Sequence, residues 1–159
     1  MPKISGLIHI SNNDRNLGRA LESLRPCDEV LVVNHGAGEE ILKLVREHGA
    51  RIINGVNGVE HGAYVQDARY DWIFCIMPDE AVAEELEASL LEWKHSEPAK
   101  DQLGYNVGVR EQNGTHWKFL APELRLANRQ KINWTGDRPP LAPDAPSLAG
   151  HILRIPGHE

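Results

Sequence analysis

Residues 4–34 read ISGLIHISNNDRNLGRALESLRPCDEVLVVN, and this stretch decides the fold. Its first seven residues are mainly apolar and lead into the polar residues 11–14, a pattern that is typical of a buried strand followed by a loop. Apolar residues then recur at helical spacing over 17–24, which predicts a helix. The uninterrupted run VLVV at 30–33 indicates a second strand that is covered on both faces. A strand, a helix and a strand in this order predict a βαβ unit with parallel strands.

The same alternation of strand and helix continues further along the chain. Apolar residues at 41–45 indicate a second helix that Gly49 ends, and the next strand begins at residue 51. A dense apolar run at 71–77 predicts a fourth strand, which Pro78 stops. These elements predict an α/β domain with an open, mostly parallel sheet and helices on both faces.

Beyond residue 98 the pattern changes, because short extended segments separated by turns replace the helices. These segments lie at 103–110, 123–128, 132–134 and 152–155. They predict a short antiparallel part of the sheet, with the proline-rich residues 138–147 as an extended loop. The last ~60 residues would be only marginally stable as a separate domain. We therefore expect residues 1–159 to fold as a single domain.

The composition limits the function. The formal net charge is -6 and no run of Lys and Arg occurs, which argues against a nucleic-acid partner. No stretch approaches about 18 apolar residues, and the first residues lack the pattern of a secretory signal. We therefore expect no transmembrane segment and a cytoplasmic location, with a peripheral place at the inner membrane face as an option. Cys27 and Cys75 have no CxxC partner and lie beside apolar residues, which predicts buried, reduced thiols.

Polar residues follow three of the predicted strands: residues 11–14, Asn34 with His35, and Asp79 with Glu80. Ligands of open α/β sheets bind beyond the carboxyl ends of the strands. We therefore expect a polar ligand site there. The first strand-to-helix turn has no glycine before Gly18, which excludes a phosphate loop of the Rossmann or Walker type.

Five short motifs occur in the order in which a known enzyme family has them. They are ISNNDRNL at 10–17, DEVLVVN at 28–34, DWIFCIMPDE at 71–80, ELRL at 123–126 and WTG at 134–136. In this order they resemble the family 2 glycosyltransferases, which have the GT-A fold, and within that family the bacterial lipopolysaccharide-core glucosyltransferases. The resemblance implies a nucleotide-binding half at residues 1–98 and an acceptor-side half at residues 99–159.

The resemblance also implies a ligand and the residues that bind it. The ligand is a UDP- or GDP-sugar, whose sugar passes to a saccharide or lipid acceptor of polysaccharide biosynthesis by inverting displacement. The implied binding residues are Ser11, Asn12, Asn13, Asp14, Asn34, Asp79 and Arg125. Asp79 would bind Mg²⁺ or Mn²⁺, because these hard cations prefer carboxylate and phosphate oxygens. Glu123 would be the catalytic base that accepts the proton of the acceptor hydroxyl.

Several positions depart from the family pattern. Asn34 stands where the family has an aspartate, and Met77 stands where the metal motif has its first aspartate. Arg138 begins the sequence RPP that replaces the family's His-Glu. An arginine near the diphosphate, Arg125, Arg138 or Arg154, could supply the charge of the metal ion. Two functions stay open: an active glycosyltransferase, and a catalytically inactive binding or assembly module of the same fold.

The candidate residues also have structural interpretations. Asp79 follows a proline and could cap a helix that starts at Ala81. Asn34 and Ser11 could satisfy backbone groups at the strand ends. The histidines, including His9, His35, His61 and His116, are scattered without the spacing of a zinc site, which favours structural or surface roles.

Overall fold

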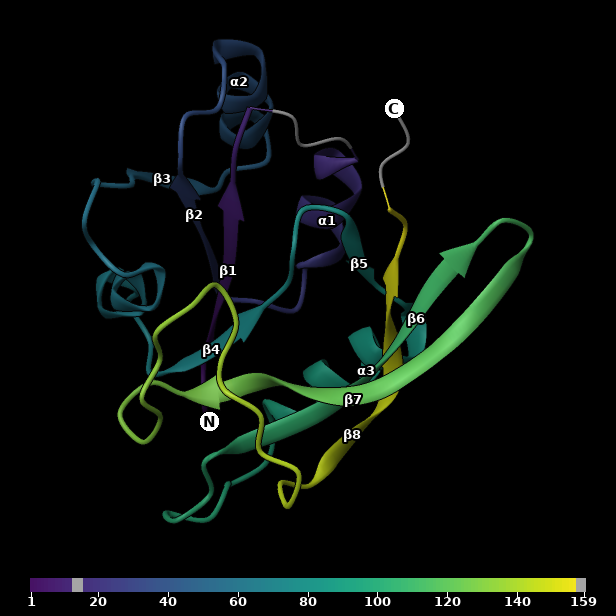
Figure 1. Cartoon of the computed structure of the whole chain (residues 1–159). Helices are drawn as coiled ribbons and strands as arrows, with labels where there is room; N and C mark the ends of the chain where they lie inside the picture. Colours follow the sequence, from purple (N-terminus) through teal and green to yellow (C-terminus); the bar gives the residue numbers. More distant parts are fainter. Residues whose placement is uncertain (13–15, 157–159) are drawn as a thin grey trace.

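An eight-stranded mixed sheet runs through the chain in the order β3-β2-β1-β4-β7-β6-β8-β5 (Figure 1). The computed structural model describes residues 1–12 and 16–156. The strands are β1 (Ile4–Ile10), β2 (Glu29–Asn34), β3 (Arg51–Asn54), β4 (Trp72–Cys75), β5 (Glu80–Val82), β6 (Gly104–Asn113), β7 (His116–Asn128) and β8 (Ser147–Arg154). The helices are α1 (Leu17–Ser23), α2 (Glu39–Glu47) and α3 (Glu84–Trp93), together with the 3₁₀ helix η1 (His61–Asp67).

The first four strands form the parallel half of the sheet. β1 pairs in parallel with both β2 and β4, and β2 pairs in parallel with β3. All seven residues of β1 are buried, as a central strand requires. Because β2 and β4 lie on opposite sides of β1, the chain connections diverge at its carboxyl end, where open α/β sheets bind ligands. The predicted parallel sheet is confirmed.

The two faces of the sheet are covered differently. Apolar residues of α1, α2 and α3 pack with Ile4 and Ile8 on one face. The other face, which includes Leu7 and Val33, is covered by η1 and by Trp134 from the loop before β8. Alternate residues of β1 therefore serve opposite faces, as the pleat of a strand dictates. Within the described residues, no helix is both long and apolar enough to cross a membrane.

Both cysteines are free thiols, as the sequence predicts, but Cys27 is only partly buried. Cys75 lies in β4 and is buried, and burial raises the pKa of its thiol to about 12. Burial also raises the pKa of the Cys27 thiol. Thiols with raised pKa values stay protonated at neutral pH and react slowly, so both cysteines are part of the packing rather than of any chemistry.

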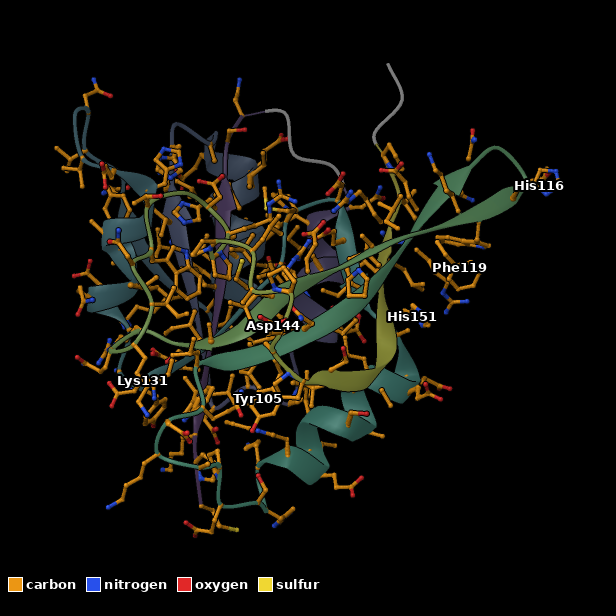
Figure 2. The ribbon with its side chains drawn as sticks, turned by 60° about the horizontal axis from the view of Figure 1, so that its bottom comes forward. Tyr105, His116, Phe119, Lys131, Asp144 and His151 are labelled. Atoms are coloured by element: carbon orange, nitrogen blue, oxygen red, sulfur yellow. The ribbon has the colours of Figure 1, made fainter. Side chains whose placement is uncertain are left out.

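A long hairpin of β6 and β7 dominates the back half of the sheet. The two strands run antiparallel out to the pair Asn113↔His116, and their far end projects beyond the other strands (Figure 1). Figure 2 shows His116 and Phe119 at that end, and Phe119 is 68% exposed. The sequence predicts only the inner parts of this hairpin, because the projecting residues lie outside the core and their large apolar side chains, Trp117 and Phe119, are exposed.

The segment at 132–134, which the sequence predicts as a strand, is irregular instead, so this prediction is wrong. Trp134 is buried among the residues that cover the η1 face of the sheet. Its neighbour Thr135 accepts a hydrogen bond of 3.0 Å from the backbone N–H of Gly62, which lies in η1. The apolar residues of this segment therefore anchor a loop to η1 and do not extend the sheet.

The residues after Pro78 form a strand before they form a helix. β5 pairs antiparallel with β8, so residues 80–82 are extended. α3 begins only at Glu84, with Ala83 as its N-cap residue. The expectation that Asp79 caps a helix starting at Ala81 is wrong, because pairing with β8 takes these residues into the sheet.

Candidate functional site

The carboxyl ends of β1 and β2 lie in register at one edge of the sheet, with Asn34 as the last residue of β2. Ser11 and Asn12 follow β1 and are exposed. Asn12 lies against Gly38, where an added Cβ would be 3.4 Å from the Asn12 Oδ1. The structure thus places these polar residues at one edge, as the sequence predicts. The other two predicted ligand residues of this loop, Asn13 and Asp14, lie outside the described residues.

The side chain of Asn34 shapes the turn that follows β2. Its Oδ1 accepts hydrogen bonds from the backbone N–H groups of Gly36 and Ala37, at 3.1 Å and 2.7 Å. Its Nδ2 donates to the Oδ1 of Asn54, the last residue of β3, at 3.1 Å. These bonds support the structural interpretation of Asn34, while the same residue also lines the cleft described next.

Among the described residues, two clefts open at this edge of the sheet. The smaller one, here the Asn34 cleft, has a volume of about 340 Å³ and is lined by Asn34, His35, Gly36, residues 55–59 and His61. The larger one, here the Met77 cleft, has a volume of about 560 Å³ and is lined by Met77, Glu123 and residues 136–141. A hydrogen bond joins the Nδ1 of His61, from the first cleft, to the Oδ1 of Asp137, from the second. The clefts are therefore adjacent, with this pair between them, and each has the size of a small-molecule site.

A buried ion pair lies beneath the Met77 cleft. Arg125 donates from Nη1 and Nη2 to the two carboxylate oxygens of Glu80, at 2.7 Å and 2.8 Å, and neither side chain is exposed. Arg154 adds two further hydrogen bonds to Glu80, at 2.9 Å and 3.0 Å. Burial alone would raise the pKa of Glu80, but the hydrogen bonds and charges of the two arginines outweigh it and hold this pKa below its usual value. Arg125 correspondingly has a raised pKa, so the pair is ionised at neutral pH.

The same arginines hold Glu123 in the wall of the Met77 cleft. Its Oε1 accepts hydrogen bonds from Arg125 at 2.9 Å and from Arg138 at 3.2 Å, and its Oε2 lies 3.6 Å from Arg154. Arg125 itself is fully buried and its guanidinium donates to protein oxygens, so it supports Glu123 from below and does not line the cleft. Arg138 is the cation that faces the cleft, with a side chain 46% exposed.

The residues around Asp79 do not fit the divalent cation that the family resemblance implies. Asp79 is half-buried, and burial together with the negative charge of Glu80 raises the pKa of Asp79. Met77 offers no carboxylate at the preceding motif position. Both carboxylate oxygens of Glu80 are already occupied by Arg125 and Arg154, whose charges would also repel a cation. The neighbouring Glu80 is therefore unable to share a cation with Asp79, which is left as a single ligand.

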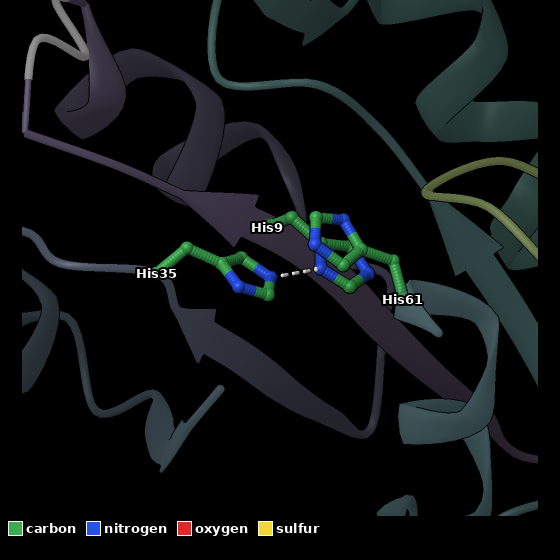
Figure 3. A group of neighbouring side chains, drawn as sticks. All are labelled: His9, His35 and His61. Atoms are coloured by element: carbon green, nitrogen blue, oxygen red, sulfur yellow. Dashed lines mark hydrogen bonds between the residues drawn. The ribbon is translucent and has the colours of Figure 1, made fainter. Parts of the chain in front are cut away.

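Three histidine side chains gather where the two clefts lie next to each other (Figure 3). His9 comes from β1, His35 follows β2, and His61 opens η1. A hydrogen bond of 2.8 Å joins the Nδ1 of His9 to the Nε2 of His35. The His61 ring stacks on both, with ring centroids 5.1 Å from His9 and 4.0 Å from His35. One ligand atom from each ring lies within 4.8 Å of the others.

The environment keeps the two inner histidines neutral. His9 is 6% exposed, and burial lowers the pKa of its imidazole to about 4 although the nearby Asp137 acts in the opposite direction. Burial and the charge of His61 lower the pKa of His35 as well. The Nε2 of His9 is buried and has no hydrogen-bond partner among the described residues. The cluster thus contains two uncharged imidazoles, His9 and His35, beside His61 and one carboxylate.

The prediction that these histidines are scattered is wrong for three of them. The sequence does hold a signal: His9 shares its face of β1 with Leu7, and His35 follows Val33 at the same spacing of two residues. Since β1 and β2 are parallel neighbours in register, residues of the same parity near their ends lie side by side. His61 comes from a segment without a periodic pattern, so nothing in the sequence places it with the other two.

No protein-family model matches the chain, and no curated protein matches it. Solved structures do match. Glucosyl-3-phosphoglycerate synthase from Mycobacterium tuberculosis, in complex with Mn²⁺, UDP and glucosyl-3-phosphoglycerate, is 15% identical with a TM-score of 0.52, over 71% of this chain and 45% of that chain. The same enzyme with Mg²⁺ and UDP is 14% identical with a TM-score of 0.52, over 72% and 45%. S. aureus TarS, residues 1–349, is 14% identical with a TM-score of 0.52, over 72% and 37%.

These similarities establish the fold. The chain has the GT-A-like fold of nucleotide-diphospho-sugar transferases, as the sequence predicts. It spans less than half of the length of these structures. At this level of identity the comparison shows the arrangement of strands and helices. The ligand and the activity have to be inferred from the residues of this chain.

Proposed function

We propose that this domain binds a nucleoside diphosphate sugar, with the base and ribose in the Asn34 cleft and the sugar diphosphate in the Met77 cleft. The observation that carries the proposal is that two ligand-sized clefts lie next to each other at the carboxyl ends of β1, β2 and β4. This is the place where the connections diverge and where sheets of this kind bind ligands. The closer assignment to family 2 glycosyltransferases of the lipopolysaccharide-core type, acting in the cytoplasm, is part of the proposal.

The chemistry of the two clefts supports this assignment of the ligand. The Asn34 cleft is rich in glycine, at Gly36, Gly55 and Gly58, so backbone groups are accessible for hydrogen bonds to a base and a ribose. Arg138 offers the Met77 cleft a planar cation that can donate to phosphate oxygens. The M. tuberculosis enzyme of the same fold has been solved with UDP and with UDP-glucose, which supports a uridine nucleotide as the first ligand to test.

Transfer of the sugar would follow from an acceptor hydroxyl placed beside Glu123. The hydroxyl oxygen would bond to the anomeric carbon while the bond from that carbon to the diphosphate breaks, and the hydroxyl proton would pass to Glu123. The acceptor would be a saccharide or a lipid of polysaccharide biosynthesis. The nucleoside diphosphate would leave from the Met77 cleft.

A second candidate is a binding module that does not transfer the sugar. It is favoured by the ion pairs of Glu123 with Arg125 and Arg138, which already occupy one of its two carboxylate oxygens. It is also favoured by Met77, which takes the place of a metal-binding carboxylate. A radiolabelled UDP-sugar incubated with saccharide and lipid acceptors separates the two candidates. Labelled product that disappears in Glu123→Gln supports transfer, whereas nucleotide binding without product supports the binding module.

Thermal melting in the presence of UDP, GDP or UDP-glucose tests the binding itself. A nucleotide at 100 times its dissociation constant stabilises the folded state by about 2.7 kcal/mol, which for a domain of this size raises the Tm by roughly 5–10 °C. We expect such a shift with at least one of these ligands in a buffer with chelator, because Arg138 requires no metal ion to bind phosphate. No shift with any of them would refute the proposed function.

The variant Arg138→Ala is expected to weaken nucleotide binding by about tenfold, since a charge-assisted hydrogen bond contributes about 1.5–3 kcal/mol and this arginine is partly solvated. Arg25→Ala is the matched control, because Arg25 is exposed and pairs with Glu87 on α3. Titration calorimetry with UDP measures both. Equal affinities of the two variants would remove Arg138 from the site.

A further inference from the structure

We propose that His9, His35 and His61 form a binding site for a divalent transition-metal ion of the zinc type, with Asp137 as its carboxylate partner. The site lies where the Asn34 and Met77 clefts lie next to each other. It is separate from the position at Asp79 and uses nitrogen donors in place of carboxylates. Such a site follows from the histidine geometry alone and does not depend on the proposed function.

The three imidazoles come from well-separated parts of the chain but are held by the framework of the fold. His9 lies on the central strand, His35 directly follows the neighbouring strand with its backbone N–H bonded to the carbonyl of Ile10 at 2.9 Å, and His61 begins η1. Each ring offers a nitrogen within 4.8 Å of the others. A metal ion bound tetrahedrally at about 2.0–2.1 Å from each nitrogen separates them by about 3.4 Å. The rings therefore need only small displacements to reach this spacing.

Binding also requires the outer ring to turn. The three rings are nearly parallel, with interplanar angles of 12°, 9° and 19°. The nitrogen lone pairs of a stacked ring lie in its own plane and do not point toward the rings above or below it. His61 therefore has to rotate about its Cβ–Cγ bond to bind the same metal ion as His9 and His35. The His61 side chain is 45% exposed, which leaves room for this rotation.

Asp137 supplies the carboxylate that commonly lies beside histidine ligands in metal proteins. One oxygen of its carboxylate bonds to the Nδ1 of His61 and lies 3.9 Å from the Nδ1 of His9. A carboxylate next to the rings can accept a hydrogen bond from an imidazole nitrogen that does not bind the metal, which orients that imidazole and raises its basicity. Three imidazoles and one carboxylate suit Zn²⁺, Co²⁺ or Ni²⁺, whereas Mg²⁺ prefers oxygen ligands.

A purely structural role explains the cluster less well. Three imidazoles packed together leave the Nε2 of the buried His9 without a partner among residues 1–12 and 16–156. An unsatisfied buried polar atom costs about 1–3 kcal/mol, which apolar side chains at these positions would avoid. A bound metal ion would instead use the nitrogen lone pairs of these residues, which apolar side chains lack.

The position of the site has a consequence that rests on the proposed function. The Met77 cleft contains two carboxylates, Glu123 and Asp137, but Arg138 is its one cationic lining residue in the described part of the chain. A dication bound by three imidazoles would keep a coordination position for a phosphate oxygen and would offset the negative charge of this cleft. The ion would then increase the affinity for UDP.

Metal titration of chelator-treated protein tests the site. We expect Zn²⁺ to bind with one equivalent and to raise the Tm by roughly 5–10 °C at 100 times its dissociation constant, and Mg²⁺ to produce no shift. Co²⁺ should give the visible absorption of a tetrahedral nitrogen-ligated ion. His61→Gln should abolish these effects, and because this side chain is half-exposed the variant should still fold, as circular dichroism will check. His116→Gln, at the projecting end of the hairpin, is the control and should bind like the unchanged protein (Figure 2).

The outcomes separate the metal site from the nucleotide site. Absence of saturable Zn²⁺ binding, or equal binding by His61→Gln and the unchanged protein, would overturn the metal site. Zn²⁺ binding without any response to UDP would leave the metal site standing and refute the proposed function. Asp137→Asn should weaken Zn²⁺ binding by about 10- to 100-fold, and an unchanged affinity would contradict the role given to that carboxylate.

Discussion

Glu80→Gln is expected to lower the free energy of unfolding by about 3–5 kcal/mol, because it leaves Arg125 as a buried charge without its main partner. Two charge-assisted hydrogen bonds from Arg125 and two from Arg154 lose their ionised acceptor in this variant. Urea denaturation of the variant and the unchanged protein measures the difference.

The control for this prediction is Glu39→Gln. Glu39 also pairs with an arginine, Arg46 on the same helix, but both side chains are largely exposed. Exposed pairs contribute about 0–1 kcal/mol, so the loss should be several times smaller. Similar losses in both variants would mean that Arg125 rehydrates or that Glu123 replaces Glu80 as its partner.

The same ion pair predicts how stability depends on pH. The folded-state pKa of Glu80 lies below the usual value for a glutamate, and Glu29, which bonds Ser5 and Arg51, has a lowered pKa too. Their stabilising contribution is therefore complete above about pH 5 and is lost as the pH falls through the folded-state values. Urea midpoints measured from pH 7 to pH 3 should decline less steeply in Glu80→Gln, and an identical slope would exclude Glu80 as a source of the acid sensitivity.

Among glycine substitutions in β6, β7 and β8, Gly150→Ala should be the most destabilising. It is expected to lower the free energy of unfolding by about 3 kcal/mol or more. Gly150 has φ +101°, and a Cβ on it would overlap the backbone nitrogen of Leu86 and lie 2.6 Å from its Cα. The substitution would therefore combine backbone strain with a clash that pushes α3 away from β8. Thermal melting should show a fall in Tm of roughly 6–12 °C.

Gly114→Ala is the matched control for Gly150→Ala. Gly114 also has a positive φ, of +64°, but an added Cβ there meets nothing within 4 Å. Only the backbone strain of about 1–2 kcal/mol applies in that turn. If the two variants lose the same stability, the close approach of α3 to β8 contributes nothing measurable.

The parallel half of the fold could be predicted because its signals are local. The apolar runs of β1 and β2 are buried on both faces, and Gly49 ends α2 with the positive φ that its position requires. The hairpin and β5 carry weaker signals. The projecting residues of the hairpin have no core to face, and residues 80–82 become a strand through pairing with β8, which lies far along the chain.

The sequence predicts the part of the candidate site that lies at the ends of strands, but it does not predict the part that loops contribute. Asn34 and Glu123 line the two clefts, while the binding and catalytic roles that the resemblance implies for them stay predictions. Arg125 belongs to the same region but is buried, because Glu80 and Glu123 supply the counter-charges that retain it below the surface. Asp137 contacts His61 because the irregular, proline-rich loop brings it there. The conformation of such a loop leaves no periodic pattern in the sequence.

The place of β8 between β6 and β5 affects how the chain can fold during synthesis. β5 pairs with β8, and α3 packs against it, with the Ser89 hydroxyl donating to the carbonyl of Ala149 at 2.8 Å. A ribosome releases residues 80–93 long before residues 147–154, so this part of the sheet has no partner strand while the intervening residues are made. The parallel half can assemble on the nascent chain, but β5 and α3 can be secured only after β8 has emerged.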